Sequence, residues 1–329
     1  MMRDLSTPLL FVAFFAAAAI VWKAGKPLAD TTETLSRHYG LGEALGGMLI
    51  LAIVTDLPEL AIVASAALRG DLSLAVGNLL GGTAAQMIVL VALDRARPEL
   101  PPLATRAASP TLIVECLLVI ALLGLVVAGP TLAGFGNLGP LALPDFLAPA
   151  LWIGGLLWIG RLRPAAGGRS TTRQSVSISR GTFAVFGLAA LATFAGGVGL
   201  EVFGEALAAR FDIGGVVFGA TVLAAATSLP ELSTGWASAK AGENELAVSD
   251  ILGGNAVLPV LLTVASLCAG ASAYAAIDGT SLYLSAIGIV MTAIYAAALI
   301  LRPKRRVLGL GPECVLLLAV YAVALICLT

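Results

Sequence analysis

The sequence predicts an all-α polytopic membrane protein in which ten transmembrane helices form two inverted five-helix repeats. Of its 329 residues, 59% are apolar and only 12% are charged, and its mean hydropathy is +0.98. Such a composition excludes an ordinary soluble domain. In addition, the motif Leu-Pro-Glu occurs twice inside long apolar segments, at 57–59 and at 229–231. The composition predicts the class, and the duplicated motif predicts the repeats.

Ten apolar segments are long enough to cross a bilayer, for which a helix needs about 20 residues. In chain order their approximate spans are 7–24, 41–67, 72–94, 109–129, 143–160, 182–203, 213–239, 245–270, 280–301 and 312–328. The second and seventh are too long for one regular helix, so we expect each to break at its proline. The first segment resembles a signal peptide, but the sixth stands at the matching place in the second half, which favours a retained span.

The lysine and arginine residues predict the orientation of the chain. The connections that follow odd-numbered segments hold 16 of the 19 basic residues, and the other side holds only Arg3, Arg69 and Arg210. We therefore expect an inner-membrane protein with the odd connections in the cytoplasm and both termini outside.

The two halves of the chain repeat each other at an offset of 172 residues. Residues 41–83 align with 213–255 without a gap, and they share glycine, threonine, proline and glutamate in the same order. Five segments is an odd number, so the second repeat enters the membrane upside down relative to the first.

These repeats define the predicted domain organisation. The first five-helix repeat covers 1–160, with its core motif at about 41–90. A linker at 161–180 follows, rich in Gly, Ser, Thr and Arg and expected in the cytoplasm. The second repeat covers 181–329, with its core motif at about 213–262.

The glutamates of the two motifs, Glu59 and Glu231, are costly in an apolar helix. A charged side chain at the bilayer centre costs about 2.5–3.5 kcal/mol, so intramembrane acids usually line a cavity or an ion path. Each neighbouring proline removes a helical hydrogen bond and frees a backbone carbonyl. Because hard cations bind through oxygen atoms, the duplicated motif predicts a cation site to which both repeats contribute.

The motifs resemble the α-repeats of the calcium/cation antiporter superfamily, most closely the sodium/calcium exchanger membrane domain. The resemblance rests on Leu-Pro-Glu in each half, followed by Gly-Asn-Leu-Leu-Gly-Gly-Thr at 77–83 and Ser-Asp-Ile-Leu-Gly-Gly-Asn at 249–255. It implies ten helices, external termini, a central site on the second, third, seventh and eighth helices, and moving gates at the first and sixth. It also implies several site groups: the acids Glu59 and Glu231, the hydroxyls of Thr55 and Thr227, and the carbonyls of Ala52 and Ala224.

The chain departs from the family pattern at several positions. Ser228 keeps the serine beside the threonine, whereas the first repeat has Asp56 there. Gly82 and Gly254 replace serines, and Gln86 keeps an amide where the second repeat has Leu258. We expect the metal ligands to be Thr55, Asp56, Glu59, Gln86, Thr227, Ser228 and Glu231.

Some polar residues allow a second interpretation. Asp56 could serve as the N-cap of the second half of a broken helix. Gln86 could join helices by hydrogen bonds. Asp250 lies two turns from Leu258, about 12 Å along a helix, so we expect it to line an access path.

The function that follows is a cation antiporter that exchanges Ca²⁺ for Na⁺ or H⁺ by alternating access at a midplane carboxylate site. Loss of three family ligands weakens a set of Na⁺ sites, and clustered carboxylates favour proton binding, so both coupling ions stay open. The expected partners are inorganic cations and the lipid bilayer, with no resident cofactor, no nucleic acid and a monomeric state.

Other function classes are less favoured. One histidine and no His-Glu helix motif argue against an intramembrane hydrolase or another enzyme. A cation channel would also use acids at mid-membrane, but inverted repeats with broken helices favour alternating access. A non-transporting family descendant that acts as a sensor or scaffold is the remaining alternative.

Overall fold

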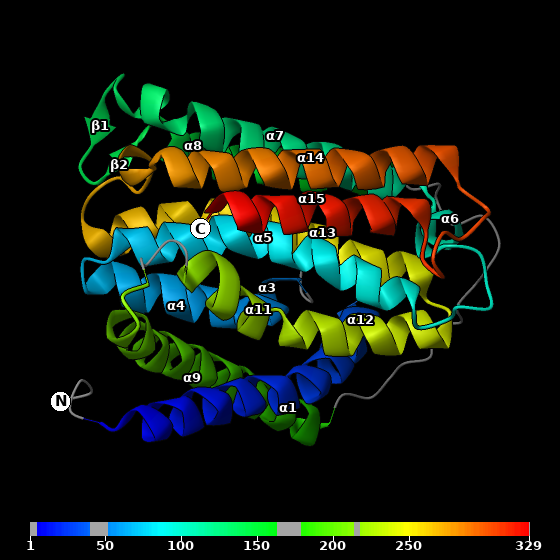
Figure 1. The fold of residues 1–329 in the computed structure, drawn as a ribbon, viewed down its shortest axis with the longest axis horizontal. Coiled ribbons are helices and arrows are strands. Elements are labelled where there is room, and N and C mark those ends of the chain that lie inside the picture. Colours follow the sequence, from blue (N-terminus) through cyan, green and yellow to red (C-terminus); the bar gives the residue numbers. More distant parts are fainter. Residues whose placement is uncertain (1–4, 40–51, 163–178, 214–217, 329) are drawn as a thin grey trace.

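The structure, a computed structural model, describes residues 5–39, 52–162, 179–213 and 218–328. These residues are almost entirely helical (Figure 1). The first half contains α1 (Thr7–Tyr39), α3 (Ala52–Thr55), α4 (Leu57–Leu68), α5 (Leu72–Asp94), α6 (Leu103–Ala107), α7 (Pro110–Ala133) and α8 (Leu143–Leu162). Two short antiparallel strands, β1 (Asn137–Leu138) and β2 (Leu141–Ala142), join α7 to α8.

The second half contains the matching elements. They are α9 (Arg180–Arg210), the π-helix η3 (Gly219–Leu223), α11 (Ala224–Thr227), α12 (Leu229–Ala241), α13 (Asn244–Ala269), the short 3-10 helix η4 (Tyr274–Ala276), α14 (Gly279–Leu301) and α15 (Pro312–Leu328). In the described residues, seven helices are by themselves long and apolar enough to cross a membrane. The chain is therefore a polytopic helical membrane protein.

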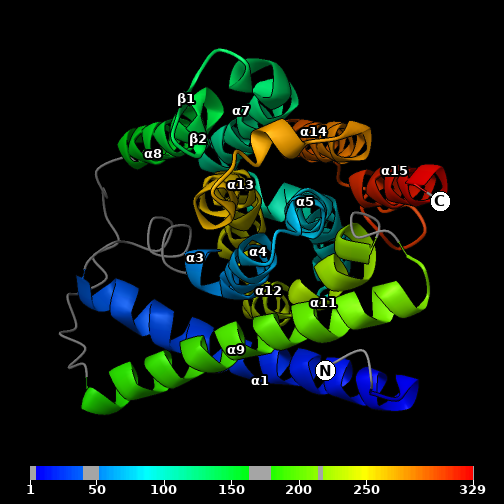
Figure 2. The same cartoon turned by 90° about the vertical axis from the view of Figure 1, so that its left-hand side faces the viewer.

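The helices form three layers (Figure 2). Helices α1 and α9 cross each other in one outer layer, and α7, α8, α14 and α15 make up the layer on the far side. Between them lie α4, α5, α12 and α13, which carry the duplicated motifs. The central layer is thus screened from the lateral surface by helices on two sides.

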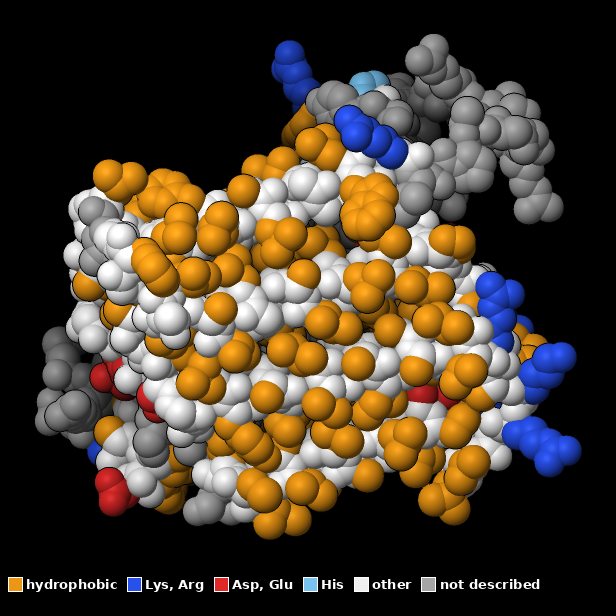
Figure 3. Space-filling model, turned by 90° about the horizontal axis from the view of Figure 1, so that it is seen from above, with side chains coloured by type: hydrophobic (Ala, Val, Ile, Leu, Met, Phe, Trp, Pro, Cys, Tyr) orange, Lys and Arg blue, Asp and Glu red, His pale blue; other side chains and the backbone are white. Residues whose placement is uncertain are grey.

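The lateral surface has the apolar character that a bilayer requires. Large side chains such as Phe15, Leu157 and Leu188 are more than half exposed. Figure 3 shows apolar side chains spread over one such face, with Lys and Arg side chains at its margins. Since water would penalise so much exposed apolar area, lipid tails are the natural neighbours of this face.

Successive connections alternate between the two ends of the bundle. Figure 1 shows the connection from α14 to α15 at one end, and the β1–β2 hairpin with the connection from α4 to α5 at the other. This alternation agrees with the odd and even connections that the sequence predicts. Which end faces the cytoplasm stays a prediction.

The predicted breaks in the second and seventh segments are confirmed. Asp56 separates α3 from α4, and Ser228 separates α11 from α12, in each case just before the Leu-Pro-Glu motif. The prolines occupy the first turn of α4 and α12, where a missing N–H is tolerated. The part of the second span before Ala52 lies outside the described residues.

Two helices are longer than their apolar spans. We expected the first span to end near residue 24 and the sixth near 203, but α1 continues to Tyr39 and α9 to Arg210. Hydropathy measures the length that fits in hydrocarbon, whereas a helix continues through polar residues that favour it, such as those after Lys23. Both helices therefore extend past their apolar cores.

The repeat is visible in matched glycines. Gly70 and Gly242, at the offset of 172, lie just after α4 and α12 with φ values of +82° and +90°. This left-handed conformation lets the chain turn at once into α5 and α13, and side chains with a Cβ rarely adopt it. The tight turns set the two motif-bearing helices of each repeat side by side.

The outer crossing helices contact the opposite repeat through another matched pair. Gly25 of α1 lies against Pro230, and a methyl group there would be 3.1 Å from the proline Cα. Gly197 of α9 lies against Pro58, and a methyl group there would be 2.8 Å from the Pro58 carbonyl oxygen. Each crossing helix thus rests on the broken helix of the other repeat.

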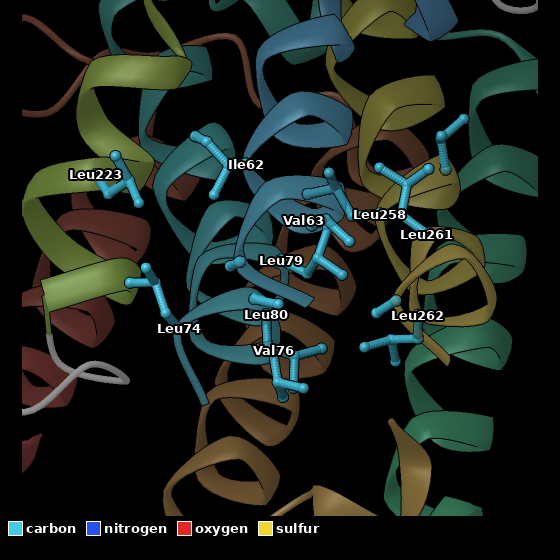
Figure 4. Packing of buried hydrophobic residues seen from close by; sticks show 14 of the residues in the cluster. Ile62, Val63, Leu74, Val76, Leu79, Leu80, Leu223, Leu258, Leu261 and Leu262 are labelled. Atoms are coloured by element: carbon cyan, nitrogen blue, oxygen red, sulfur yellow. The ribbon is translucent and has the colours of Figure 1, made fainter. Parts of the chain in front are cut away.

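Apolar packing holds the central layer together. Figure 4 shows Ile62 and Val63 of α4, Leu79 and Leu80 of α5, and Leu258 of α13 gathered between the helices. These five side chains are fully buried and belong to one core cluster. This packing fixes the spacing of the helices that hold the polar residues described next.

Candidate cation site

Three acids meet where the broken helices approach each other. Asp56, Glu59 and Glu231 each offer one carboxylate oxygen, and these oxygens lie within 4.8 Å of one another. All three side chains are buried. The sequence predicted that the acids of the two repeats share a site, and the structure brings them together.

The electrostatic environment of this cluster is strongly negative. The charged groups that act on Glu231 are Glu59, Asp56 and Asp250, and all of them are acids. Among the described residues, both oxygens of Glu59 and of Glu231 lack a hydrogen-bond partner. Buried carboxylates without a basic partner are costly, so such a cluster requires a cation or protons.

Asp56 is not a helix cap through its side chain. It stands directly before α4, yet its carboxylate accepts no capping hydrogen bond from the first turn. Instead, the Gln86 amide nitrogen on α5 donates to Asp56 Oδ1 at 3.5 Å. The capping alternative is therefore wrong, and the side chain turns toward the acid cluster.

Gln86 and Gly254 complete the surroundings of Asp56. A methyl group at Gly254 would lie 3.1 Å from Asp56 Oδ1 and 3.2 Å from Gln86 Oε1. The glycine of α13 thus leaves room for two polar side chains that come from the first repeat. The Gln86 oxygen has no hydrogen-bond partner among the described residues, so it is available to a cation.

The corresponding place in the other half of the site is apolar. A methyl group at Gly82 would lie 3.3 Å from Leu258 Cδ1. Leu258 therefore occupies the space beside Gly82, where the other half places Asp56 and Gln86 beside Gly254. The site has one polar side and one apolar side.

The threonine and serine hydroxyls contact the helix breaks. Thr55 and Thr227 each donate to the carbonyl three residues earlier, at 3.2 Å. Ser228 donates to the same Ala224 oxygen at 2.8 Å. The Thr227 side chain also faces Glu59. The hydroxyl oxygens keep their acceptor capacity while their protons are engaged.

The carbonyls implied as bare ligands are hydrogen-bonded. Ala52 O accepts from the Asp56 N–H at 3.0 Å, and Ala224 O accepts from the Ser228 N–H at 3.1 Å. The expectation of freed oxygens at Ala52 and Ala224 is therefore wrong. A proline has no N–H to donate, so the carbonyl four residues earlier loses its helical hydrogen bond. For Pro58 and Pro230 these carbonyls are Val54 and Ala226.

Asp250 lies closer to the cluster than expected. We expected it on an access path, but it is buried, it acts electrostatically on Asp56, and Thr234 Oγ1 donates to its Oδ2 at 2.8 Å. The distance between Asp250 and Leu258 along α13 did not predict this position, because the hydrogen bond that holds Asp250 comes from Thr234 on the neighbouring helix α12. The sequence signal that could have revealed it is Thr234 itself, which stands one turn after Glu231.

Comparisons with known proteins agree with this fold. A family model described as "Sodium/calcium exchanger protein" matches residues 9–134 and 181–329. Inner membrane protein YrbG of Escherichia coli (strain K12) is 29% identical over 79% of this chain and 80% of its own length. CaxA of Alkalimonas amylolytica, a candidate antiporter by name, is 27% identical over 72% of this chain and 73% of its own.

Solved structures of the sodium-calcium exchanger NCX_Mj have a similar fold. The form soaked with 2.5 mM Na⁺ and 0.1 mM Ca²⁺ has a TM-score of 0.66 and 19% identity, and the match covers 98% of this chain and 99% of that one. The form soaked with Sr²⁺ at the same concentration gives the same values. At this identity the similarity concerns the fold.

Proposed function

The chain belongs to the sodium/calcium exchanger protein family of cation antiporters, and we propose that it exchanges Ca²⁺ for protons at the cluster of Asp56, Glu59 and Glu231. The observation that carries this proposal is the approach of three buried carboxylate oxygens to within 4.8 Å. Three negative charges without a basic partner suit a divalent cation better than a single monovalent one.

The number and kind of oxygens also suit Ca²⁺. This ion takes about six to eight oxygen ligands, and it accepts carboxylates in one- or two-oxygen contact together with neutral oxygens. Three carboxylates supply up to six oxygens, and the Gln86 amide adds a neutral one beside Asp56. Mg²⁺ retains its waters more strongly and demands a stricter geometry.

The apolar side of the site has few oxygen atoms that could bind a second cation, and this favours protons as the counter-ion. Leu258 and Gly82 provide no side-chain oxygen on the apolar side, which weakens separate Na⁺ sites there. When Ca²⁺ leaves, the three carboxylates face one another in a low dielectric, and protons are the smallest ions that remove this repulsion. Sodium is the competing counter-ion, and the experiment below separates the two.

Alternating access would come from movement of the outer crossing helices over the central layer. The contacts of Gly25 with Pro230 and of Gly197 with Pro58 connect α1 and α9 to the helix breaks that carry the acids. The concentration of Lys and Arg in the odd connections supports an inner-membrane location with both termini outside. One chain contributes both halves of the site, which supports a monomer as the transporting unit.

The test is uptake of radiolabelled Ca²⁺ into proteoliposomes that contain the purified protein. We expect an acidic interior to drive Ca²⁺ accumulation, and a protonophore to abolish it. An outward Na⁺ gradient at equal pH should drive none. Accumulation driven by Na⁺ alone would make sodium the counter-ion.

Two further outcomes would replace antiport altogether. Ca²⁺ current without any counter-ion would indicate a channel, and no flux from correctly folded protein would indicate a non-transporting relative. Protein with Glu59→Gln provides the matched control for leaks.

A further inference from the structure

A shallow, open groove lies along the last two turns of α5, toward its basic end. It has a volume of about 280 Å³ and is lined by Ile88, Val91, Ala92, Arg95 and Leu310. Four of these residues are apolar, and Arg95 is the charged one. The groove thus combines an apolar wall with a single guanidinium group.

The groove is shaped by a rigid connection between α14 and α15. Arg306 turns inward and forms an ion pair with Asp94 at 2.7 Å, and Asp94 also accepts the Gly311 N–H at 2.9 Å. Val307 and Leu310 bond to each other through two backbone hydrogen bonds. Leu310 is consequently held in place over the end of α5.

The rim of the groove is positive. Arg95 is exposed, and its guanidinium donates to the Gly309 carbonyl at 3.4 Å. Arg302, Lys304 and Arg305 do not line the groove, but they are exposed on the connection from α14 to α15 that also carries Gly309 and Leu310. Figure 3 shows Lys and Arg side chains gathered at this end of the molecule.

The nearby acids do not neutralise this rim. Asp94 is buried and paired with Arg306, Glu99 pairs with Arg97 at 3.0 Å, and Glu313 is buried beside Gly311. Among the described residues, no ion pair is formed by Arg95 or by the three exposed basic residues of the connection. The rim therefore offers free positive charge to an anion.

The length of the groove along α5 matches a lipid rather than a small anion. Ile88 and Arg95 are seven residues apart, which corresponds to about 10 Å along a helix. That distance separates the phosphate of a phospholipid at the interface from the upper part of its acyl chains. Leu308, 86% exposed beside the basic residues, would enter the same interface.

We propose that this groove binds an anionic phospholipid, with one acyl chain along Ile88, Val91 and Ala92 and the phosphate at Arg95. Basic pockets between membrane helices are suited to anionic headgroups, and the apolar wall requires an attached chain. The lipid would brace α5, the helix that also carries Gln86.

The test is lipid retention and thermal stability of the purified protein in detergent. Phosphatidylglycerol and phosphatidylcholine with identical acyl chains are compared by native mass spectrometry and melting. We expect one retained phosphatidylglycerol per chain and a melting temperature raised by about 5 °C relative to phosphatidylcholine. Equal effects of the two lipids would overturn the proposal.

Variants separate the two parts of the groove. Arg95→Gln should lower phosphatidylglycerol retention at least about fivefold by removing a charge-assisted contact. Ala92→Trp should lower it similarly by filling the apolar wall while the arginine remains. Arg97→Gln is the matched control and should retain the lipid, because Arg97 lies on the connection after α5, as Arg95 does, but is paired with Glu99.

Two results would contradict the assignment. Loss of retention in Arg97→Gln equal to that in Arg95→Gln would indicate a diffuse charge effect. Displacement of the lipid by millimolar inorganic phosphate, or full stabilisation by phosphate alone, would indicate a site for a free anion. Neither readout depends on transport, so failure here is distinguishable from failure of the proposed exchange.

Discussion

The two sides of the candidate cation site come from the two copies of one motif, yet they differ in polarity. On one side Asp56 and Gln86 lie against Gly254, whereas on the other Leu258 lies against Gly82. The duplicated backbone is kept on both sides, including the helix breaks and the tight turns. The comparison teaches that two repeats can keep the same backbone frame while the polarity of the side chains on it differs.

The polar side also bears on the prediction that Gly254 lacks a ligand hydroxyl. The resemblance to the family predicts a serine at the position of Gly254, and the Asp56 carboxylate from the other repeat lies directly against that glycine. If that prediction holds, a carboxylate from a different helix takes the place of the hydroxyl. The substitution increases the negative charge of the cluster, which favours a divalent cation and protons over sodium.

The largest expected effect comes from the residues that both sides share. Glu59→Gln or Glu231→Gln should reduce Ca²⁺ exchange by at least about 100-fold, equivalent to about 3 kcal/mol of binding free energy. Each change removes one of three clustered carboxylates while keeping the side-chain volume. Uptake into proteoliposomes measures the effect, and Glu99→Gln, an exposed acid outside the site, should leave uptake unchanged.

The role of the shared acids would be refuted by retained exchange in either variant. Size-exclusion profiles and melting temperatures close to those of the unmodified protein are needed to separate loss of function from loss of fold.

A matched pair of glycine substitutions probes the difference in polarity directly. Gly254→Ala places a methyl group 3.1 Å from Asp56 Oδ1 and should weaken Ca²⁺ affinity about tenfold, because both polar side chains must move. Gly82→Ala meets only the flexible end of Leu258 at 3.3 Å and should change affinity by less than about threefold. Equal losses would mean that the two sides contribute alike.

A smaller effect is expected where the crossing helices rest on the prolines. Gly197→Ala would bring a methyl group to 2.8 Å from backbone atoms of Pro58, and we expect exchange to slow about fivefold. Gly25→Ala, at 3.1 Å from Pro230, should slow it about twofold. Initial rates at saturating Ca²⁺ measure both. A rate change confined to Gly25→Ala would contradict the contact geometry.

Much of the fold could be predicted from the sequence because bilayer physics is strict. Apolar length locates the spans, and a proline beside an acid in such a span predicts a break, as found at Asp56 and Ser228. The association of Glu59 with Glu231 was predicted from the duplicated motif, the inverted repeats and the resemblance to the family. These features depend on local sequence or on exact repetition.

Other features depend on packing between repeats and could not be predicted. The contact of Asp56 with Gly254, and the bond from Thr234 that places Asp250 beside the cluster, join residues from different helices. The buried Glu201 of α9 is another case, since its ion pair with Arg69 and its hydrogen bond from Ser65 at 3.1 Å cross between elements. No periodicity in the sequence marks such contacts.

The measurement that tests the central claim most directly is equilibrium binding of Ca²⁺ to purified Asp56→Asn and Ser228→Ala proteins. If the polar side dominates, the unmodified protein binds one Ca²⁺ per chain, Asp56→Asn weakens the affinity at least about tenfold, and Ser228→Ala changes it by less than about threefold. Equal affinity losses in the two variants, or unchanged affinity in Asp56→Asn, would contradict the account.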